Sequence, residues 1–166
     1  VLALDTARPG PYAALEVTRP ERVLSAPEFE LPDLAGASHR LRDYRGRVVV
    51  LHFWATFCRP CREELPSLQS LWRRYRDRGL TVLAVAADRG GRAPPARFVE
   101  RHIPDLPVLW DREGRVRNAY EVWALPTTYL LRADGRFAGR VVGARDWSSP
   151  AALALVRDLL PRAETR

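Results

Sequence analysis

The two cysteines of the chain, Cys58 and Cys61, are its only thiols and are separated by two residues. An apolar run, Val48–Trp54, precedes them, and an amphipathic segment from about residue 59 to 78 follows. This order predicts a buried strand, a tight turn and a helix that carries the C-x-x-C pair at its start. A helix N-terminus favours a thiolate, and a second thiol close by can resolve a mixed disulfide. The spacing therefore indicates thiol–disulfide exchange.

The two cysteines are expected to have different roles. Cys58 lies just before the helix or at its N-cap, where N–H groups without intrahelical partners favour an anion. Cys61 falls inside the first turn, where burial is expected. Pro60 also falls there, at a position where a missing N–H costs nothing. We therefore predict that Cys58 is the nucleophile and Cys61 the resolving thiol.

Three other interpretations of the pair are weaker. A structural disulfide would close a small and constrained ring. A zinc site needs two further ligands, and none of the histidines (His39, His52 and His102) has paired-ligand spacing. A c-type haem needs a histidine directly after the second cysteine, where this chain has Arg62. The sequence therefore predicts neither a metal nor a cofactor.

Length and charge limit the class of protein. A chain of 166 residues with ordinary apolar content is expected to form one main domain. The formal net charge is +7 and every basic residue is an arginine, but the arginines are scattered and no nucleic-acid motif accompanies them. No apolar run approaches 18 residues, which excludes a membrane span in the visible chain. We therefore predict no nucleic-acid partner and no spanning segment.

The pattern of apolar residues divides the chain into an N-terminal extension or linker, 1–24, and a domain, 25–166. Within the domain, alternating or continuous apolar runs and turn signals predict strands and helices in sequence. The expected strands are a hairpin within 27–41 and segments 48–54, 80–86, 106–110, 127–131 and 137–142. The expected helices are 59–78, about 94–102, 116–120 and a closing helix from Pro150. Strand–helix–strand–helix followed by an antiparallel hairpin and a helix predicts an α/β fold.

Several motifs together point to a family. The run Trp54–Cys61 is followed by Pro66, five residues after the second cysteine, and much later by Leu125-Pro126-Thr127-Thr128. Further parts of the pattern stand before the core strand and near the end of the chain: 26–33, 43–46 and 143–150. Over about residues 25–162 the chain resembles thioredoxin-fold proteins, and more narrowly the TlpA/ResA-like extracytoplasmic thiol–disulfide oxidoreductases. The resemblance implies a thioredoxin fold, a mixed central β-sheet flanked by helices, with an N-terminal β-hairpin and a central insert at 87–111.

The resemblance also implies where a substrate binds. Pro126 is expected to form a cis peptide bond opposite the cysteine pair, which would turn the backbone of Leu125 and Thr127 toward a substrate peptide. We further expect Trp54, Phe57 and Pro60 to form, with the Leu125–Pro126 edge, an apolar rim around Cys58.

Two positions depart from related families. His52 stands where cytosolic thioredoxins carry a buried aspartate, so it is a candidate proton relay for Cys61; the alternative is a core histidine bonded within the fold. ResA-like proteins also carry a glutamate near the cysteines. The resemblance places this glutamate in the loop after the third strand, but the corresponding loop here, 87–91, has no glutamate, and Asp88 is only a weak substitute.

These observations predict a protein-disulfide reductase acting on cysteine-containing protein substrates outside the cytoplasm. By family analogy the substrates belong to cytochrome c or copper-site maturation, and a membrane thiol donor re-reduces the enzyme. We expect a monomer, located in the periplasm or cell envelope. Since position 1 is not methionine, a removed signal peptide or an N-terminal membrane anchor upstream is also expected. The alternatives are an oxidase that donates disulfides and a copper(I)-binding metallochaperone.

Overall fold

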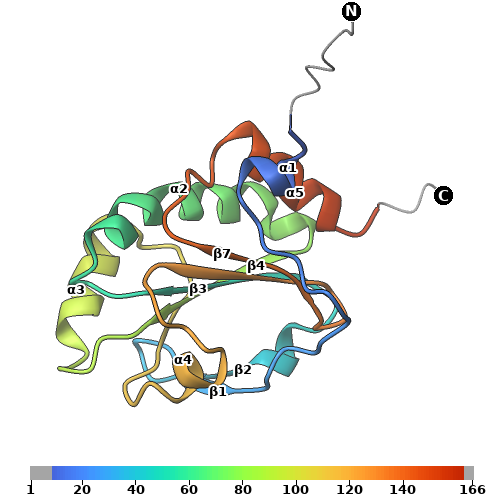
Figure 1. The fold of residues 1–166 in the computed structure, drawn as a ribbon. Coiled ribbons are helices and arrows are strands. Elements are labelled where there is room, and N and C mark those ends of the chain that lie inside the picture. Colours follow the sequence, from blue (N-terminus) through green and yellow to red (C-terminus); the bar gives the residue numbers. More distant parts are fainter. Residues whose placement is uncertain (1–8, 163–166) are drawn as a thin grey trace, which may run out of the picture.

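The computed structural model describes residues 9–162, in which a central sheet is covered on both faces (Figure 1). The sheet order is β5-β4-β3-β6-β7. The strands are β3 (Val48–Trp54), β4 (Leu80–Ala86), β5 (Val108–Trp110), β6 (Thr127–Leu131) and β7 (Phe137–Val142). β3 pairs in parallel with β4, and β4 with β5, whereas β6 and β7 are antiparallel to their neighbours. The predicted α/β class and mixed sheet are therefore confirmed.

The central strand β3 contributes side chains to two separate cores. Val48, Val50 and Trp54 pack on one face of the sheet, and the intervening Val49, Leu51 and Phe53 pack on the other. Because side chains alternate along a strand, His52 shares the face of Val50 and Trp54. This parity directs the histidine toward the helix that carries the cysteines.

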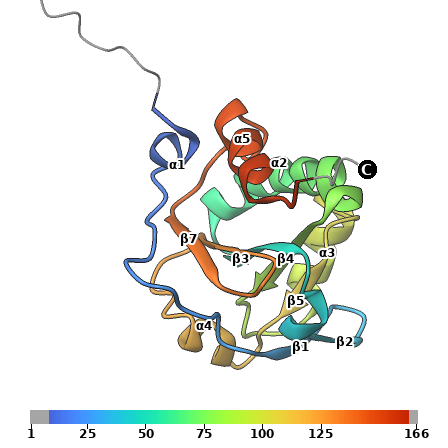
Figure 2. The same ribbon diagram turned by 90° about the vertical axis from the view of Figure 1, so that its right-hand side faces the viewer.

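That helix, α2 (Arg59–Tyr75), covers the first face together with α5 (Pro150–Leu159) (Figures 1 and 2). The apolar stripe of α2 is fully or almost fully buried: Cys61, Leu65, Leu68, Leu71 and Tyr75. A short 3-10 helix, Arg76–Arg78, extends α2 until Gly79 ends it in the left-handed conformation. Ser149 caps α5 by accepting a hydrogen bond from the Ala152 N–H at 3.2 Å.

The opposite face is covered by the predicted hairpin, β1 (Glu30–Pro32) and β2 (Ser38–Arg40), and by α4 (Arg115–Ala119) (Figure 1). A 3-10 helix, Leu41–Tyr44, links the hairpin to β3. The core beneath these elements is rich in aromatic side chains that meet edge to face or tilted: Phe53, Tyr120, Tyr129 and Phe137.

The predicted central insert supplies one helix and one edge strand. α3 (Ala93–His102) follows the loop after β4, and its Phe98 ring lies 5.3 Å from the ring of Trp54. The chain then returns as β5 beside β4. The insert therefore flanks the end of the sheet from which the cysteine loop leaves.

The described part of the predicted N-terminal extension packs on the domain. A short helix, α1 (Pro11–Ala14), lies beside α5, and the Tyr12 hydroxyl donates to Asp158 at 3.0 Å (Figure 1). Leu15 joins the main core, and Thr18 forms an antiparallel bridge with Arg140 of β7. The domain boundary after residue 24 remains a prediction. Between residues 9 and 162, every helix is too short or too polar to cross a bilayer.

Candidate active site

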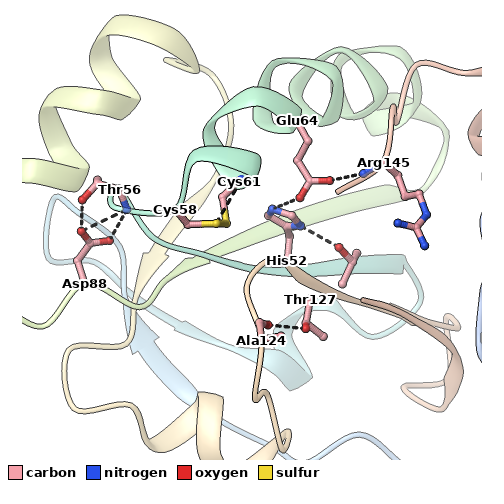
Figure 3. Close-up of a disulfide and its surroundings, with 10 residues drawn as sticks. His52, Thr56, Cys58, Cys61, Glu64, Asp88, Ala124, Thr127 and Arg145 are labelled. Atoms are coloured by element: carbon pink, nitrogen blue, oxygen red, sulfur yellow. Dashed lines mark hydrogen bonds and ion pairs between the residues drawn. A yellow bond between two sulfur atoms is a disulfide. The ribbon is translucent and has the colours of Figure 1, made fainter. Parts of the chain in front are cut away.

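The cysteine pair lies at the N-terminus of α2, as predicted. Cys58 is the N-cap residue, and its sulfur accepts a hydrogen bond from the Cys61 N–H at 3.3 Å. The two cysteines are joined as a disulfide (Figure 3). Cys61 is completely buried, whereas Cys58 is only half-buried. An incoming thiol or disulfide can therefore reach Cys58 more readily than Cys61.

The turn before Cys58 is held by a buried carboxylate. Asp88, just after β4, accepts hydrogen bonds from the Thr56 N–H at 3.2 Å and from the Thr56 hydroxyl (Figure 3). Its backbone carbonyl accepts from the Trp110 indole N–H at 2.7 Å. Asp88 therefore fixes the path of the loop into α2, and its carboxylate does not lie free beside the sulfurs.

A second buried carboxyl, Glu64, lies one turn after Cys61 on the same face of α2. One of its oxygens accepts from the backbone N–H of Arg145 at 2.8 Å and from the Trp147 indole N–H at 3.1 Å. The other oxygen is 3.2 Å from His52 Nε2. The contact with His52 lacks hydrogen-bond geometry, so both of those atoms remain without a hydrogen-bond partner.

His52 has its other ring nitrogen in a defined contact. Nδ1 lies 2.9 Å from the hydroxyl of Thr128 on the neighbouring strand β6. Figure 3 shows the imidazole between the disulfide and Glu64. His52 therefore links the sheet to the carboxyl on α2, immediately behind the cysteines.

Burial shifts both members of this pair toward their neutral forms. Desolvation raises the pKa of Glu64 to about 7, and the hydrogen bonds from Arg145 and Trp147 only partly oppose that rise. Desolvation also lowers the pKa of His52 to about 3. At neutral pH the imidazole is therefore uncharged, while the carboxyl lies near its titration midpoint and can take up or release a proton.

The loop before β6 forms the other side of the site. The Leu125–Pro126 peptide bond is cis, as the resemblance implies. Pro126 is buried and its carbonyl accepts from the Gly143 N–H at 2.9 Å. The Thr127 hydroxyl donates to the Ala124 carbonyl at 2.7 Å (Figure 3), and this side chain is buried. The Thr127 side chain therefore stabilises the loop and is not itself exposed to a substrate.

The predicted apolar rim is only partly present. Phe57 is 75% exposed, Pro60 is exposed and Leu125 is half-buried. The prediction that Trp54 joins this rim is wrong, because its side chain is completely buried in the core beside Phe98. As the last residue of β3, Trp54 has the same parity as Val50 and packs under the helices.

Glu64, behind the cysteines, and Trp123, in the segment that leads to the cis proline, were not predicted. The expected acidic group lies on α2 and not in the loop after β4, because the position of Glu64 three residues after Cys61 places it on the buried stripe of the helix. Trp123, two residues before Leu125, is 87% exposed. A tryptophan two residues before the Leu-Pro-Thr motif was the signal available in the sequence. Across residues 9–162 no cluster of three or more His, Cys, Asp or Glu side chains could hold a metal ion.

Comparisons with known proteins agree with this geometry. Residues 24–138 match the AhpC/TSA family. The thiol-disulfide oxidoreductase ResA of Geobacillus kaustophilus (strain HTA426) is 40% identical over 119 residues, covering 72% of this chain and 68% of that protein. A solved structure from Chlorobium tepidum, assigned as the thiol:disulfide interchange protein DsbE, has 30% identity and a TM-score of 0.71, covering 81% of this chain and 92% of that one.

A further solved structure is a secreted Mycobacterium tuberculosis disulfide oxidoreductase described as homologous to Escherichia coli DsbE. It has 25% identity and a TM-score of 0.68, covering 76% of this chain and 94% of that one. The fold and the C-x-x-C pair at a helix N-terminus thus define a thioredoxin-fold thiol–disulfide oxidoreductase. The chain belongs to the AhpC/TSA family, within the group of thiol–disulfide oxidoreductases that includes ResA.

The raised pKa of Glu64 predicts how stability depends on pH. The unfolded carboxyl titrates near 4.5 and the folded one near 7, so the folded state binds the proton more tightly between these values. The free energy of unfolding should therefore fall as pH rises from about 4.5 to 7. Glu64→Gln removes this titration, and its stability advantage over wild type should grow by about 2 kcal/mol between pH 5.5 and 8.

Urea unfolding of the oxidised proteins at the two pH values measures this difference. Glu63→Gln is the matched control, because Glu63 is exposed on the same helix turn. The difference in free energy of unfolding between this variant and wild type should be the same at both pH values. A Glu64→Gln advantage that is the same at both pH values would contradict the buried, protonated carboxyl.

Proposed function

We propose that the protein reduces disulfides in protein substrates outside the cytoplasm. The observation that carries this proposal is the different burial of the two cysteines. Cys58 is half-buried at the helix N-terminus, and Cys61 is fully buried behind it. In the reduced enzyme the Cys58 thiolate attacks a substrate disulfide and releases one substrate thiolate. Cys61 then attacks Cys58 in the mixed disulfide, and the second substrate thiolate leaves.

The reaction moves two electrons from the enzyme to the substrate. The enzyme finishes with the Cys58–Cys61 disulfide that the structure contains, and the substrate finishes with two thiols. A thiol donor must then return two electrons to the enzyme, and we propose a donor at the membrane. Disulfide donation would run the same steps in reverse. If the redox potential of the Cys58–Cys61 couple lies well below that of strong disulfide-donating oxidants, the couple favours reduction of the substrate.

We propose that the His52–Glu64 pair receives the proton that Cys61 loses during its attack. A neutral imidazole can accept a proton on one nitrogen and release one from the other. With a pKa near 7, the Glu64 carboxylate is the better final acceptor, because the pKa of His52 is lowered to about 3. The proton relay predicted for His52 alone is therefore extended to a pair.

Phe57, Pro60 and Leu125 are proposed to contact the substrate, with Trp123 as an added apolar contact. Phe57 and Trp123 are among the most exposed large apolar side chains of the described chain, and exposed apolar groups favour extended or unfolded peptides. Pro126 would set the backbone edge at which such a peptide pairs. Apocytochrome c and the cysteine ligands of a copper site are the substrate classes we propose.

We also propose an extracytoplasmic location and a monomeric enzyme. The M. tuberculosis relative is described as secreted, which supports the location. A signal peptide or membrane anchor upstream of the printed sequence would deliver the domain to the envelope.

The roles of the cysteines predict which variant traps partners. Cys61→Ala should stop the reaction at the mixed disulfide, because the resolving thiol is gone, and covalent complexes should accumulate. Cys58→Ala, the matched control, should form far fewer, because Cys61 is buried. Non-reducing gels of envelope extracts, followed by mass spectrometry of the trapped species, measure this. Equal trapping by the two variants, or none by Cys61→Ala, would overturn the proposed function.

The proton-transfer proposal predicts slower resolution of the mixed disulfide in Glu64→Gln and in His52→Ala. General-base catalysis contributes a factor of ~10² or more, so we expect at least a tenfold loss at pH 7.5. In wild type the rate should rise through pH 7 as Glu64 ionises, and this rise should be absent from Glu64→Gln. Stopped-flow measurement of the resolution step tests this. Unchanged rates and pH profiles in both variants would exclude the pair from proton transfer.

A further inference from the structure

A groove of about 380 Å³ lies directly beside the cysteine loop. Phe57, the residue before Cys58, forms one wall. The loop after β4 forms the floor, and Arg89 and Arg117 contribute two guanidinium groups. The groove therefore combines apolar and basic lining, and one of its lining residues directly precedes Cys58 in the sequence.

The guanidinium groups of both arginines contact neutral groups. The Arg117 backbone N–H donates to Asp111 at 2.8 Å, and its Nε donates to the Val122 carbonyl at 3.2 Å. The Arg89 guanidinium packs against Gly114, where an added Cβ would lie 3.0 Å from Nη2. Neither arginine forms an ion pair with a carboxylate of residues 9–162.

The one acidic residue that lines the groove is already engaged. Asp88 is buried, and its carboxylate accepts hydrogen bonds from the backbone and hydroxyl of Thr56. Figure 3 shows the Asp88 carboxylate turned toward Thr56 of the cysteine loop. The exposed Arg89 and the half-buried Arg117 therefore line the groove without a free carboxylate beside them. This charge distribution is complementary to an anion.

The position of the groove relates it to a bound peptide. β3 leads to Cys58 and lies between β4 and β6. The groove extends beyond the end of β4, and the cis Leu125–Pro126 bond directly precedes β6. Because β4 and β6 lie on opposite sides of β3, the groove and the cis bond lie beyond the two strands that flank the one leading to Cys58, with neighbouring strands ~4.8 Å apart. A peptide paired at Leu125, with its cysteine over Cys58, would bring a residue one to three positions away to the groove at ~3.3 Å per residue.

We propose that this groove selects substrates that carry an acidic side chain close to the target cysteine. The carboxylate binds between Arg89 and Arg117, and the aliphatic part of the same side chain packs on Phe57. Arginine suits this role, since its planar guanidinium can bind a carboxylate in a bidentate manner. The inference rests on the proposed reductase function and adds a substrate class to it.

Short peptides test the proposal. Each contains one cysteine joined by a disulfide to 2-mercaptoethanol, and a Glu, Gln or Lys two residues before or two residues after that cysteine. Reduction by the reduced enzyme is followed by chromatography, and each rate is divided by the rate with dithiothreitol to remove intrinsic reactivity. In at least one of the two series, the Glu peptide should react about fivefold or more faster than the Lys peptide at low ionic strength. The difference should shrink at 0.5 M salt.

Two charge-reversal variants locate the effect. Arg89→Glu should remove or invert the order of the peptides, and Arg62→Glu should preserve it. Arg62 directly follows Cys61 but lies outside the groove, so its variant carries the same charge change near the cysteines. If both variants lose the preference for the Glu peptide equally, the preference comes from the net positive charge of the protein, and the groove proposal is wrong. Should Arg89→Glu fail to fold, Arg117→Glu replaces it in the same comparison with Arg62→Glu.

The possible failures are distinguishable. If the enzyme reduces the Glu, Gln and Lys peptides at equal normalised rates, the groove proposal is wrong and the reductase function stands. If it reduces none of them, and insulin disulfides also remain intact, the proposed function itself is wrong.

Discussion

The first turn of α2 has backbone N–H groups without carbonyl partners inside the helix, and the Cys58 sulfur lies at that end of the helix. The Cys61 N–H donates directly to this sulfur at 3.3 Å, so in the reduced protein the bond that caps the helix would also favour a thiolate at Cys58. β3 and the Asp88 carboxylate fix the loop before it, and the packed stripe of α2 fixes the helix behind it. The chemistry of the pair therefore depends on where this one helix begins.

Behind the helix N-terminus, the fold keeps a carboxyl and an imidazole in the core at a cost in stability. Both groups lose hydration, which holds His52 neutral and brings the pKa of Glu64 to about 7. A well-packed apolar pair would destabilise the core less. The proposed role in proton transfer would account for the polar groups at these two positions. The same burial that destabilises the carboxylate gives it an affinity for protons suited to a thiol at neutral pH.

Much of this arrangement could be predicted from the sequence, because the deciding signals are local. The continuous apolar run of β3, the stripe of α2 and the Leu-Pro-Thr motif each specify one element. What could not be predicted depends on which side chains face each other across elements. Trp54 ends a strand that is buried on both faces, so hydrophobicity alone does not show which face it packs on. In the structure it packs on the face covered by α2 and α5. From the sequence alone Glu64 is expected to be a solvated helix residue. Its burial depends on Arg145 and Trp147, which are distant in the sequence and donate hydrogen bonds to it.

The different accessibility of the two sulfurs is the property on which the proposed reaction depends most directly. It can be measured by alkylating the fully reduced protein with limiting iodoacetamide at pH 7 and locating the modified cysteine by mass spectrometry. Modification is predicted almost entirely at Cys58, and faster than in the same protein unfolded in urea, since the helix N-terminus favours the reactive thiolate. Modification of Cys61 first, or of both cysteines at the same rate, would contradict the assignment of Cys58 as the attacking thiol.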